Sequence, residues 1–222
     1  MTIGLSSFQL KMIAIISMVI DHVGMLMFPE EMAFRVIGRM SFPIYCFLIV
    51  EGFYHTSNVK NYIKRLAVFA LISEIPFNIL VSGNLLDVEH QNVFFTLLIG
   101  LLTVYAINNT INPMLKSLIL VAGAMAAIAL MTDYSFYGII LIYVFFNMRE
   151  KRLFACIFMA VMSFIVSPIQ GSATMAVIPI MLYNGEKGPG FMDKKVWKYT
   201  FYAFYPVHMM ALYVIGCFIS GL

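Results

Sequence analysis

The chain has few charged residues. Only 11% of its 222 residues are Asp, Glu, Lys or Arg, whereas 62% are hydrophobic, and the mean hydropathy is +0.91. Soluble domains average about a quarter charged residues, so this composition argues against a water-soluble globule and favours a membrane protein. The net charge of +3 is not gathered into a basic stripe on a soluble face, so we expect no nucleic-acid partner.

Cysteines, linkers and repeats are also scarce. The three cysteines, Cys46, Cys156 and Cys217, lie in apolar runs without a CxxC pair, so we expect buried small side chains and no metal site. The N-terminus has no charged region leading to a small-x-small cleavage site, so the first apolar run is expected to stay as a helix. The absence of long linkers predicts a single transmembrane domain over residues 1–222. The absence of an internal repeat disfavours transporter folds built from two similar halves.

Long apolar runs dominate what is present. A bilayer core needs about 20 apolar residues per helix, and on this scale the sequence predicts an all-α bundle of about nine transmembrane helices. The sixth to eighth runs are short enough to be re-entrant or half-spanning, which leaves the number open by one or two. The predicted spans are 8–28, 33–55, 62–82, 92–108, 113–131, 134–148, 152–167, 171–183 and 199–220.

Basic residues occur in alternate loops. Residues 29–32, 84–91 and 167–172 contain no Lys or Arg. Because positive residues stay cytoplasmic, the pattern predicts a multi-pass protein of the inner (cytoplasmic) membrane with its N-terminus inside and its C-terminus outside. The basic loop residues are Lys60, Lys64, Arg65, Arg149, Lys151, Arg152, Lys187, Lys194, Lys195 and Lys198.

Polar side chains on five predicted helices fall in the outer half of the membrane. A charged residue at the centre of a span costs at least ~2.5 kcal/mol, so such residues are usually functional. We therefore expect His22, Arg39 and Glu74 to lie around one water-accessible cavity, with Pro43, Pro76 and Pro206 kinking three of the helices. The residues in this layer are Asp21, His22, Arg35, Arg39, Glu74, Asn78, Gln91, Asn92, Asp133, Tyr205 and His208.

The neighbours Asp21 and His22 are expected to have different partners. They lie about 100° apart on a helix and cannot face each other. We expect Asp21, Arg35, Arg39 and Glu74 to form two net-neutral pairs, which would leave His22 uncommitted and free to accept a proton. Ion pairing as purely structural support is the alternative interpretation.

Several stretches together resemble one known family. They are LKMIAIISMVIDHVG, RVIGRMSFPIYCFLIVEGFYHTSNVKNYIKRL, ISEIPFN, QNVFFTLLIGL and YNGEKG…FYPVHM, which run in this order from Leu10 to about Met210. The chain resembles the TraX family of integral-membrane proteins, named for the F-pilin acetylase of conjugative plasmids. The motifs Asp-His-x-Gly, Gly-Arg-x-x-Phe-Pro-Ile and Ser-Glu-Ile-Pro-Phe-Asn are specific, because they are not generic membrane sequence.

The resemblance implies acetyl transfer from acetyl-CoA to an amine or hydroxyl acceptor, with a peptide, a pilin-like protein or a small molecule as acceptor. His22 would act as general base, with transient acetylation of His22 itself as the alternative, Arg35 or Arg39 would stabilise the oxyanion, and Asp21 or Glu74 would orient the imidazole. The acceptor would be held by Asn78, Gln91, Asn92, Asp133, Tyr205 and His208. The acetyl-CoA phosphates would suit the inner side, where Glu51 and His55 share a helix face and a glycine-rich loop carries lysine. The predicted cofactor-binding residues are Glu51, His55, Lys60, Lys64, Arg65, Asn184 and Lys187.

Two other function classes fit the same residues. A proton-coupled transporter could use Asp21, His22, Glu74 and His208 as a relay. A non-catalytic membrane scaffold would tolerate His22→Ala without losing any activity.

Overall fold

A computed structural model describes residues 4–190 and 195–220 of the chain. These residues form helices, and they contain two isolated β-bridges but no strand. The chain divides into two compact units, the first formed by Met1–Leu48 with Glu150–Leu222 and the second by Ile49–Arg149. Residue Lys194, a predicted inner-loop lysine, lies outside the described residues.

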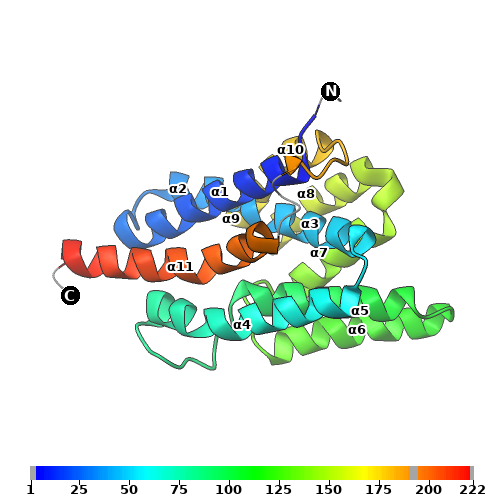
Figure 1. The fold of residues 1–222 in the computed structure, drawn as a ribbon, viewed down its shortest axis with the longest axis horizontal. Helices are drawn as coiled ribbons and strands as arrows, with labels where there is room; N and C mark the ends of the chain where they lie inside the picture. Colours follow the sequence, from blue (N-terminus) through cyan, green and yellow to red (C-terminus); the bar gives the residue numbers. More distant parts are fainter. Residues whose placement is uncertain (1–3, 191–194, 221–222) are drawn as a thin grey trace. The chain divides into compact units, whose positions relative to one another are not determined.

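The first unit combines helices from the N-terminal and the C-terminal parts of the chain. Its helix α1 lies alongside α2 and α11, and α8 packs against the short helices that follow it (Figure 1). The unit contains α1 (Ser7–Met27), α2 (Met32–Gly38), the beginning of α3 (Ser41–His55), α8 (Arg152–Val166), α9 (Pro168–Gly171), η2 (Ser172–Ala176), α10 (Val177–Met181) and α11 (Lys195–Ser220).

The start of α1 is defined by a capping box. The Ser6 side chain accepts from the Gln9 amide at 3.4 Å, and the Gln9 side chain accepts from the Ser6 amide at 2.8 Å. This reciprocal pair satisfies two backbone donors that a helix start would otherwise leave unpaired. One turn further on, Leu10 and Ala14 are fully buried, so the cap sets which face of α1 enters the core.

Two glycines allow α1 and α2 to approach closely. A Cβ atom at Gly24 would overlap the side chain of Phe34, and one at Gly38 would overlap the side chain of Asp21. Both glycines belong to the motifs Asp-His-x-Gly and Gly-Arg-x-x-Phe-Pro-Ile. The motif glycines therefore set the distance at which α2 meets the polar residues of α1.

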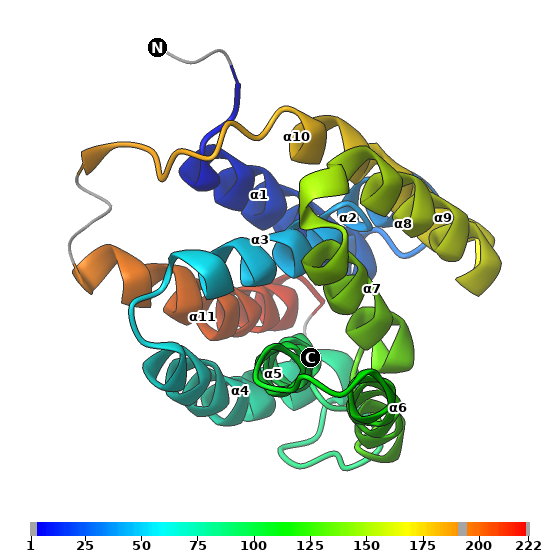
Figure 2. The ribbon, with the colours of Figure 1, turned by 90° about the vertical axis from the view of Figure 1, so that its right-hand side faces the viewer.

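The second unit is a group of helices around α5. Helix α5 packs against α4, α6 and α7, and α4, α5 and α6 run side by side in both views (Figures 1 and 2). Asparagines 58, 92 and 112 cap α4, α5 and α6 with their side-chain oxygens, and Gly83 ends α4 in the left-handed region at φ 71°. The unit contains the rest of α3, α4 (Val59–Ser82), α5 (Val93–Asn108), α6 (Pro113–Ala129) and α7 (Ser135–Asn147), and the 3-10 turn η1 (Arg149–Lys151) follows at its end.

Most predicted segments are confirmed as helices to within a few residues, and the predicted span 33–55 matches Met32–His55, a stretch long enough to cross a membrane. It is interrupted at Arg39 and Met40, which agrees with the predicted kink, because Pro43 has no amide to donate to the Arg39 carbonyl. Pro43 itself lies in the first turn of α3. Proline is tolerated there because the first amides of a helix have no intrahelical partner. The predicted span 171–183 is a series of short turns, α9, η2 and α10. Pro76 and Pro206 lie inside continuous helices.

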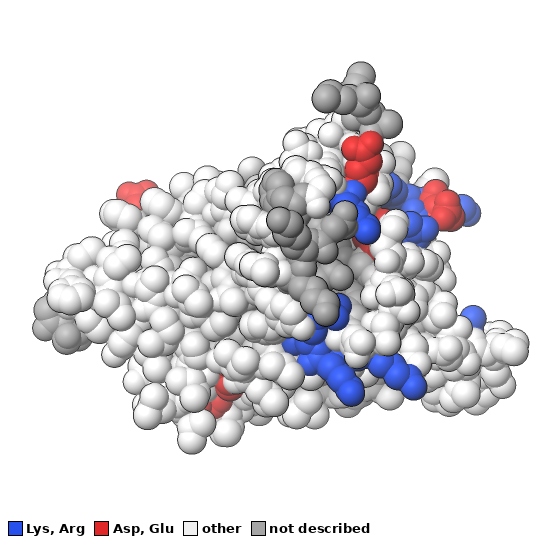
Figure 3. Space-filling model, in the orientation of Figure 1, with Lys and Arg blue, Asp and Glu red and all other residues white. Residues whose placement is uncertain are grey.

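Four stretches are long and apolar enough to cross a membrane: Ser7–Met27, Met32–His55, Val59–Ser82 and Tyr199–Ile219. Three shorter apolar helices, α5 to α7, accompany them. Large apolar side chains are exposed on these helices, among them Leu71 at 68% and Phe218 at 86%, as expected for contact with lipid. Most of the face shown in Figure 3 carries no charged side chain. The chain is therefore a helical, multi-pass membrane protein, while nine spans and a cytoplasmic N-terminus stay predictions.

Candidate functional site

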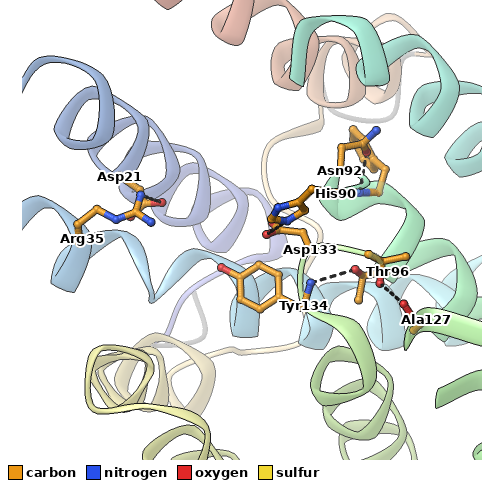
Figure 4. Close-up of polar contacts among 10 residues, drawn as sticks. Asp21, Arg35, His90, Asn92, Thr96, Ala127, Asp133 and Tyr134 are labelled. Atoms are coloured by element: carbon orange, nitrogen blue, oxygen red, sulfur yellow. Dashed lines mark hydrogen bonds and ion pairs between the residues drawn. The ribbon is translucent and has the colours of Figure 1, made fainter. Parts of the chain in front are cut away.

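Asp21 on α1 forms ion pairs with two arginines, Arg35 on α2 and Arg39 directly after it. Arg35 Nη1 donates to Asp21 Oδ2 at 3.0 Å, and Arg39 Nη2 lies 3.6 Å from Asp21 Oδ1. Figure 4 shows Asp21 and Arg35 pointing toward each other between α1 and α2. The three side chains are only 15–29% exposed. The predicted contact between Asp21 and an arginine is confirmed, and one carboxylate shared by two guanidinium groups leaves this triad with a net charge of +1.

His22 is not uncommitted, contrary to the prediction. Its Nδ1 lies 2.8 Å from Nε2 of His208 on α11, a hydrogen-bond distance. Tyr205, one turn earlier on α11, is buried and tilted against both imidazole rings. His22 is also near enough to Arg35 and Arg39 for their charges to act on its ring. The sequence placed His22 and His208 in one layer but could not show that they touch.

The prediction of two net-neutral pairs is wrong. Glu74 Oε2 accepts from Asn92 Nδ2, which also donates to the Ala70 carbonyl at 2.9 Å. Asp21 pairs with both arginines, so the two arginines are not divided between Asp21 and Glu74. Arg35 and Arg39 are one helical turn apart, so both reach the same carboxylate, and spacing alone did not show how many partners each would take.

The second unit holds polar atoms without partners around Glu74. In the described part of the chain, Glu74 Oε1 and both side-chain polar atoms of Asn78 are buried without a hydrogen bond, and Asn78 is 1% exposed. By contrast, the Asn92 side chain is fully used, because its oxygen also accepts from the Phe94 amide at 3.0 Å. Among the predicted acceptor-binding residues of this unit, Asn78 therefore has side-chain polar atoms without a hydrogen bond in the described part of the chain, whereas the Asn92 side chain is bonded at both ends.

The other two acceptor candidates of this unit, Gln91 and Asp133, lie where the loop before α5 meets the turn before α7. Gln91 and Thr132 form an isolated parallel bridge, and Asp133 accepts a hydrogen bond from His90 at 3.1 Å (Figure 4). The hydrogen bond to the Asp133 carboxylate raises the pKa of His90 above its usual value. These contacts join two loops, which gives both residues a structural role.

The predicted cofactor residues Glu51 and His55 form a compact cluster with an arginine. Arg149 Nε donates to Glu51 Oε1 at 2.9 Å, and the His55 ring nitrogen Nδ1 donates to the Glu51 carbonyl at 2.8 Å. The Arg149 guanidinium also lies 4.4 Å from the centre of the Tyr54 ring. Glu51 is 6% exposed, so its carboxylate serves as the buried partner of Arg149.

The basic residues of α4 make fewer polar contacts than Glu51 and Arg149 do. Lys60 and Lys64 are exposed, and the Arg65 guanidinium lies 5.6 Å from the centre of the Tyr62 ring. These side chains stay predictions as phosphate-binding groups.

The loop 183–190 is built largely around the start of α1. The carbonyls of Glu186 and Lys187 accept from the first amides of α1, at 2.7 and 3.1 Å, and Asn184 Oδ1 accepts from the Glu186 amide at 3.0 Å. Gly188, at φ 109°, lies so close to Phe8 that a Cβ would come within 2.7 Å of it. The close approach to α1 therefore explains why glycine occurs at position 188. A phosphate site formed by the backbone amides of this loop stays a prediction.

Sequence reasoning missed three important residues. Arg149 and His90 each contact a carboxylate at hydrogen-bond distance, and Gly38 makes room for Asp21. Arg149 was counted only as a loop charge, and a partner almost 100 residues away leaves no local pattern. Gly38 was detectable, because it lies inside a motif next to Arg39.

Comparison with known proteins decides the family. The TraX protein family model matches residues 6–216, nearly the whole chain. This chain belongs to the TraX family. A probable fimbrial assembly protein, FimC of serogroup H1 from Dichelobacter nodosus, is 30% identical over 238 aligned residues that cover 95% of each chain. An uncharacterised protein from Rickettsia prowazekii (strain Madrid E) is 30% identical over 103 residues, 46% of this TraX-family chain and 38% of that protein. No solved structure matches the chain.

Proposed function

We propose that this TraX-family protein is a membrane-embedded acetyltransferase that moves an acetyl group from acetyl-CoA to an amine or hydroxyl acceptor. The observation that carries the proposal is the arrangement in the first unit, where an imidazole lies beside a positively charged triad. His22 supplies a ring nitrogen that can accept a proton from the attacking group. Asp21, Arg35 and Arg39 supply the net positive charge.

The charge of the triad suits the reaction. Attack on a thioester carbonyl places negative charge on its oxygen, and preorganised donors at that position lower the barrier by about 3 kcal/mol or more. Arg35 and Arg39 together exceed the charge of Asp21, so a developing oxyanion would meet a net positive field. Asp21 acts through the arginines and is a positioning residue.

Acetyl-CoA would be bound from the cytoplasmic side. Exposed Lys60 and Lys64 are suited to its phosphates, provided that the loop before α4 is cytoplasmic as the distribution of basic residues predicts. The name of the FimC relative supports a pilin-like protein as acceptor in this chain too.

The direct test is acetyl transfer by the purified protein in detergent or lipid nanodiscs. Release of the CoA thiol is followed with a synthetic fimbrial-subunit peptide whose amino terminus is free, and with the same peptide blocked. We expect thiol release that requires a free amine or hydroxyl and that falls by about 10²–10⁴ in His22→Ala, the usual contribution of a general base. Thermal unfolding of the variant checks that it is folded.

Two outcomes would overturn the proposal. His22→Ala with normal turnover would remove the base. Proton-driven uptake into proteoliposomes without thiol release would favour the transporter.

A further inference from the structure

We infer that His208 is the positioning residue of His22, and that it fixes His22 as the Nδ1–H tautomer so that Nε2 is the nitrogen that accepts the proton. This inference rests on the proposed function for its catalytic meaning, but the tautomer itself follows from the contacts alone. The two histidines come from α1 and α11, which are neighbours in the first unit.

The protonation of His208 is set by its own helix. His208 Nδ1 lies 2.9 Å from the Phe204 carbonyl oxygen, one turn earlier on α11. A carbonyl oxygen can only accept a hydrogen bond, so Nδ1 must carry the proton. In the neutral ring Nε2 then has a lone pair and no hydrogen.

The contact between the rings is a directed hydrogen bond. His22 Nδ1 and His208 Nε2 are 2.8 Å apart, the ring centres are 5.0 Å apart and the planes differ by 14°. The centre-to-centre distance is about the sum of the N–N distance and the two distances from nitrogen to ring centre. This requires the rings to meet end to end and nearly in one plane, the geometry that a linear N–H···N bond needs.

When both rings are neutral, the hydrogen bond between them can have only one donor. His208 Nε2 can only accept, so His22 Nδ1 must donate, and His22 Nε2 is left with a free lone pair. The His208 ring cannot easily turn away, because the Phe204 ring is stacked on it at 5.1 Å and 9° and the Phe204 carbonyl holds its Nδ1. His208 is 7% exposed, which keeps water from competing for the bond.

The assignment gives a balanced proton path. As the acceptor nitrogen or oxygen forms its bond to the acetyl carbon, its proton passes to His22 Nε2 and the carbonyl oxygen becomes an oxyanion. When the oxyanion collapses, the C–S bond breaks and the CoA thiolate takes the proton from Nε2. Throughout, His22 Nδ1–H donates to His208, which stabilises the positive charge on His22 without itself touching the substrate.

Two substitutions separate this role from packing. His208→Phe keeps a flat ring but removes the acceptor, whereas His208→Gln supplies an amide oxygen that can accept from His22. We expect kcat to fall about 100-fold or more in His208→Phe, since a base in the wrong tautomer loses most of its effect. The KM for acetyl-CoA should stay within about 2-fold, and His208→Gln should recover at least about 10-fold in kcat. His90→Gln, which removes an imidazole in the second unit, is the control and should keep wild-type kcat.

The tautomer can be measured without turnover. In protein labelled with ¹⁵N in its histidine rings, the nitrogen shifts show which nitrogen of His22 carries the proton. We expect Nδ1–H in the wild type and a change toward Nε2–H, the form that imidazole prefers in water, in His208→Phe. Wild-type His22 protonated at Nε2 would overturn the inference whatever the activity.

The outcomes distinguish the two proposals. A folded His208→Phe with wild-type kcat, beside an inactive His22→Ala, overturns the role of His208 alone. An active His22→Ala overturns the acetyltransfer mechanism, and the nitrogen shifts still decide the tautomer. A loss of kcat in His208→Phe that His208→Gln does not recover, with His22 unchanged in tautomer, assigns His208 to packing only.

Discussion

Removing the charge of Asp21 is the most informative single perturbation of stability. Asp21→Asn keeps the size of the side chain but leaves Arg35 and Arg39, 29% and 17% exposed, without their carboxylate. At the observed distances of 3.0 and 3.6 Å and an effective dielectric constant of about 20, each attraction is about 5 kcal/mol. Much of this attraction is offset by the free energy needed to remove water from the three charged groups. We therefore expect Asp21→Asn to lower the free energy of unfolding by about 3–5 kcal/mol, the value typical of breaking a buried pair.

The loss should be visible in thermal unfolding of the detergent-purified protein. For a chain of this length, 3–5 kcal/mol corresponds to a fall in Tm of about 6–20 °C. Glu30→Gln is the matched control, because it also removes one negative charge, from an exposed residue between α1 and α2, and should change Tm by about 2 °C or less.

A second variant tests the cause. Asp21→Asn combined with Arg35→Met restores the net charge of the triad to +1, and it should be more stable than Asp21→Asn alone by about 0.5–3 kcal/mol. If Asp21→Asn unfolds at the same temperature as the wild type, or if the double variant is less stable by the sum of both losses, the triad does not act as one charge-balanced unit.

Two further predictions concern the second unit. Arg149→Met should lower stability by about 3 kcal/mol in thermal unfolding, because it leaves the buried Glu51 carboxylate unpaired, and an unchanged Tm would show that the pair is not formed. The hydrogen bond to Asp133 raises the pKa of His90, so the stabilisation should be complete below pH 6.5 and lost as the pH rises through the raised value. The Tm difference between wild type and His90→Gln should therefore be largest near pH 6 and disappear at alkaline pH, and a difference that grows with pH would contradict the assignment.

The positions of most helices could be predicted from the sequence. Apolar runs of membrane length, bounded by capping residues such as Asn58 and Asn92, specify helices through interactions within a few residues. The break at Arg39 and Met40 also has a local cause, because Pro43 leaves the Arg39 carbonyl without its helical donor.

The pairing of the polar residues depended on tertiary structure. The sequence identified Asp21, His22 and the arginines, and helix geometry showed that Asp21 and His22 must face different neighbours. It could not show that Asp21 takes both arginines, nor that His22 meets His208, 186 residues further along the chain.

The physical reason is the range over which each interaction acts. Hydrogen bonds within helices and burial of apolar runs are decided locally, so composition and spacing specify them. The contact between two histidines requires α1 and α11 to pack at one register, and the approach of Asp21 to its arginines requires the gap left by Gly38. Such register is decided by the sum of many side-chain contacts between distant segments, which only the folded chain brings together.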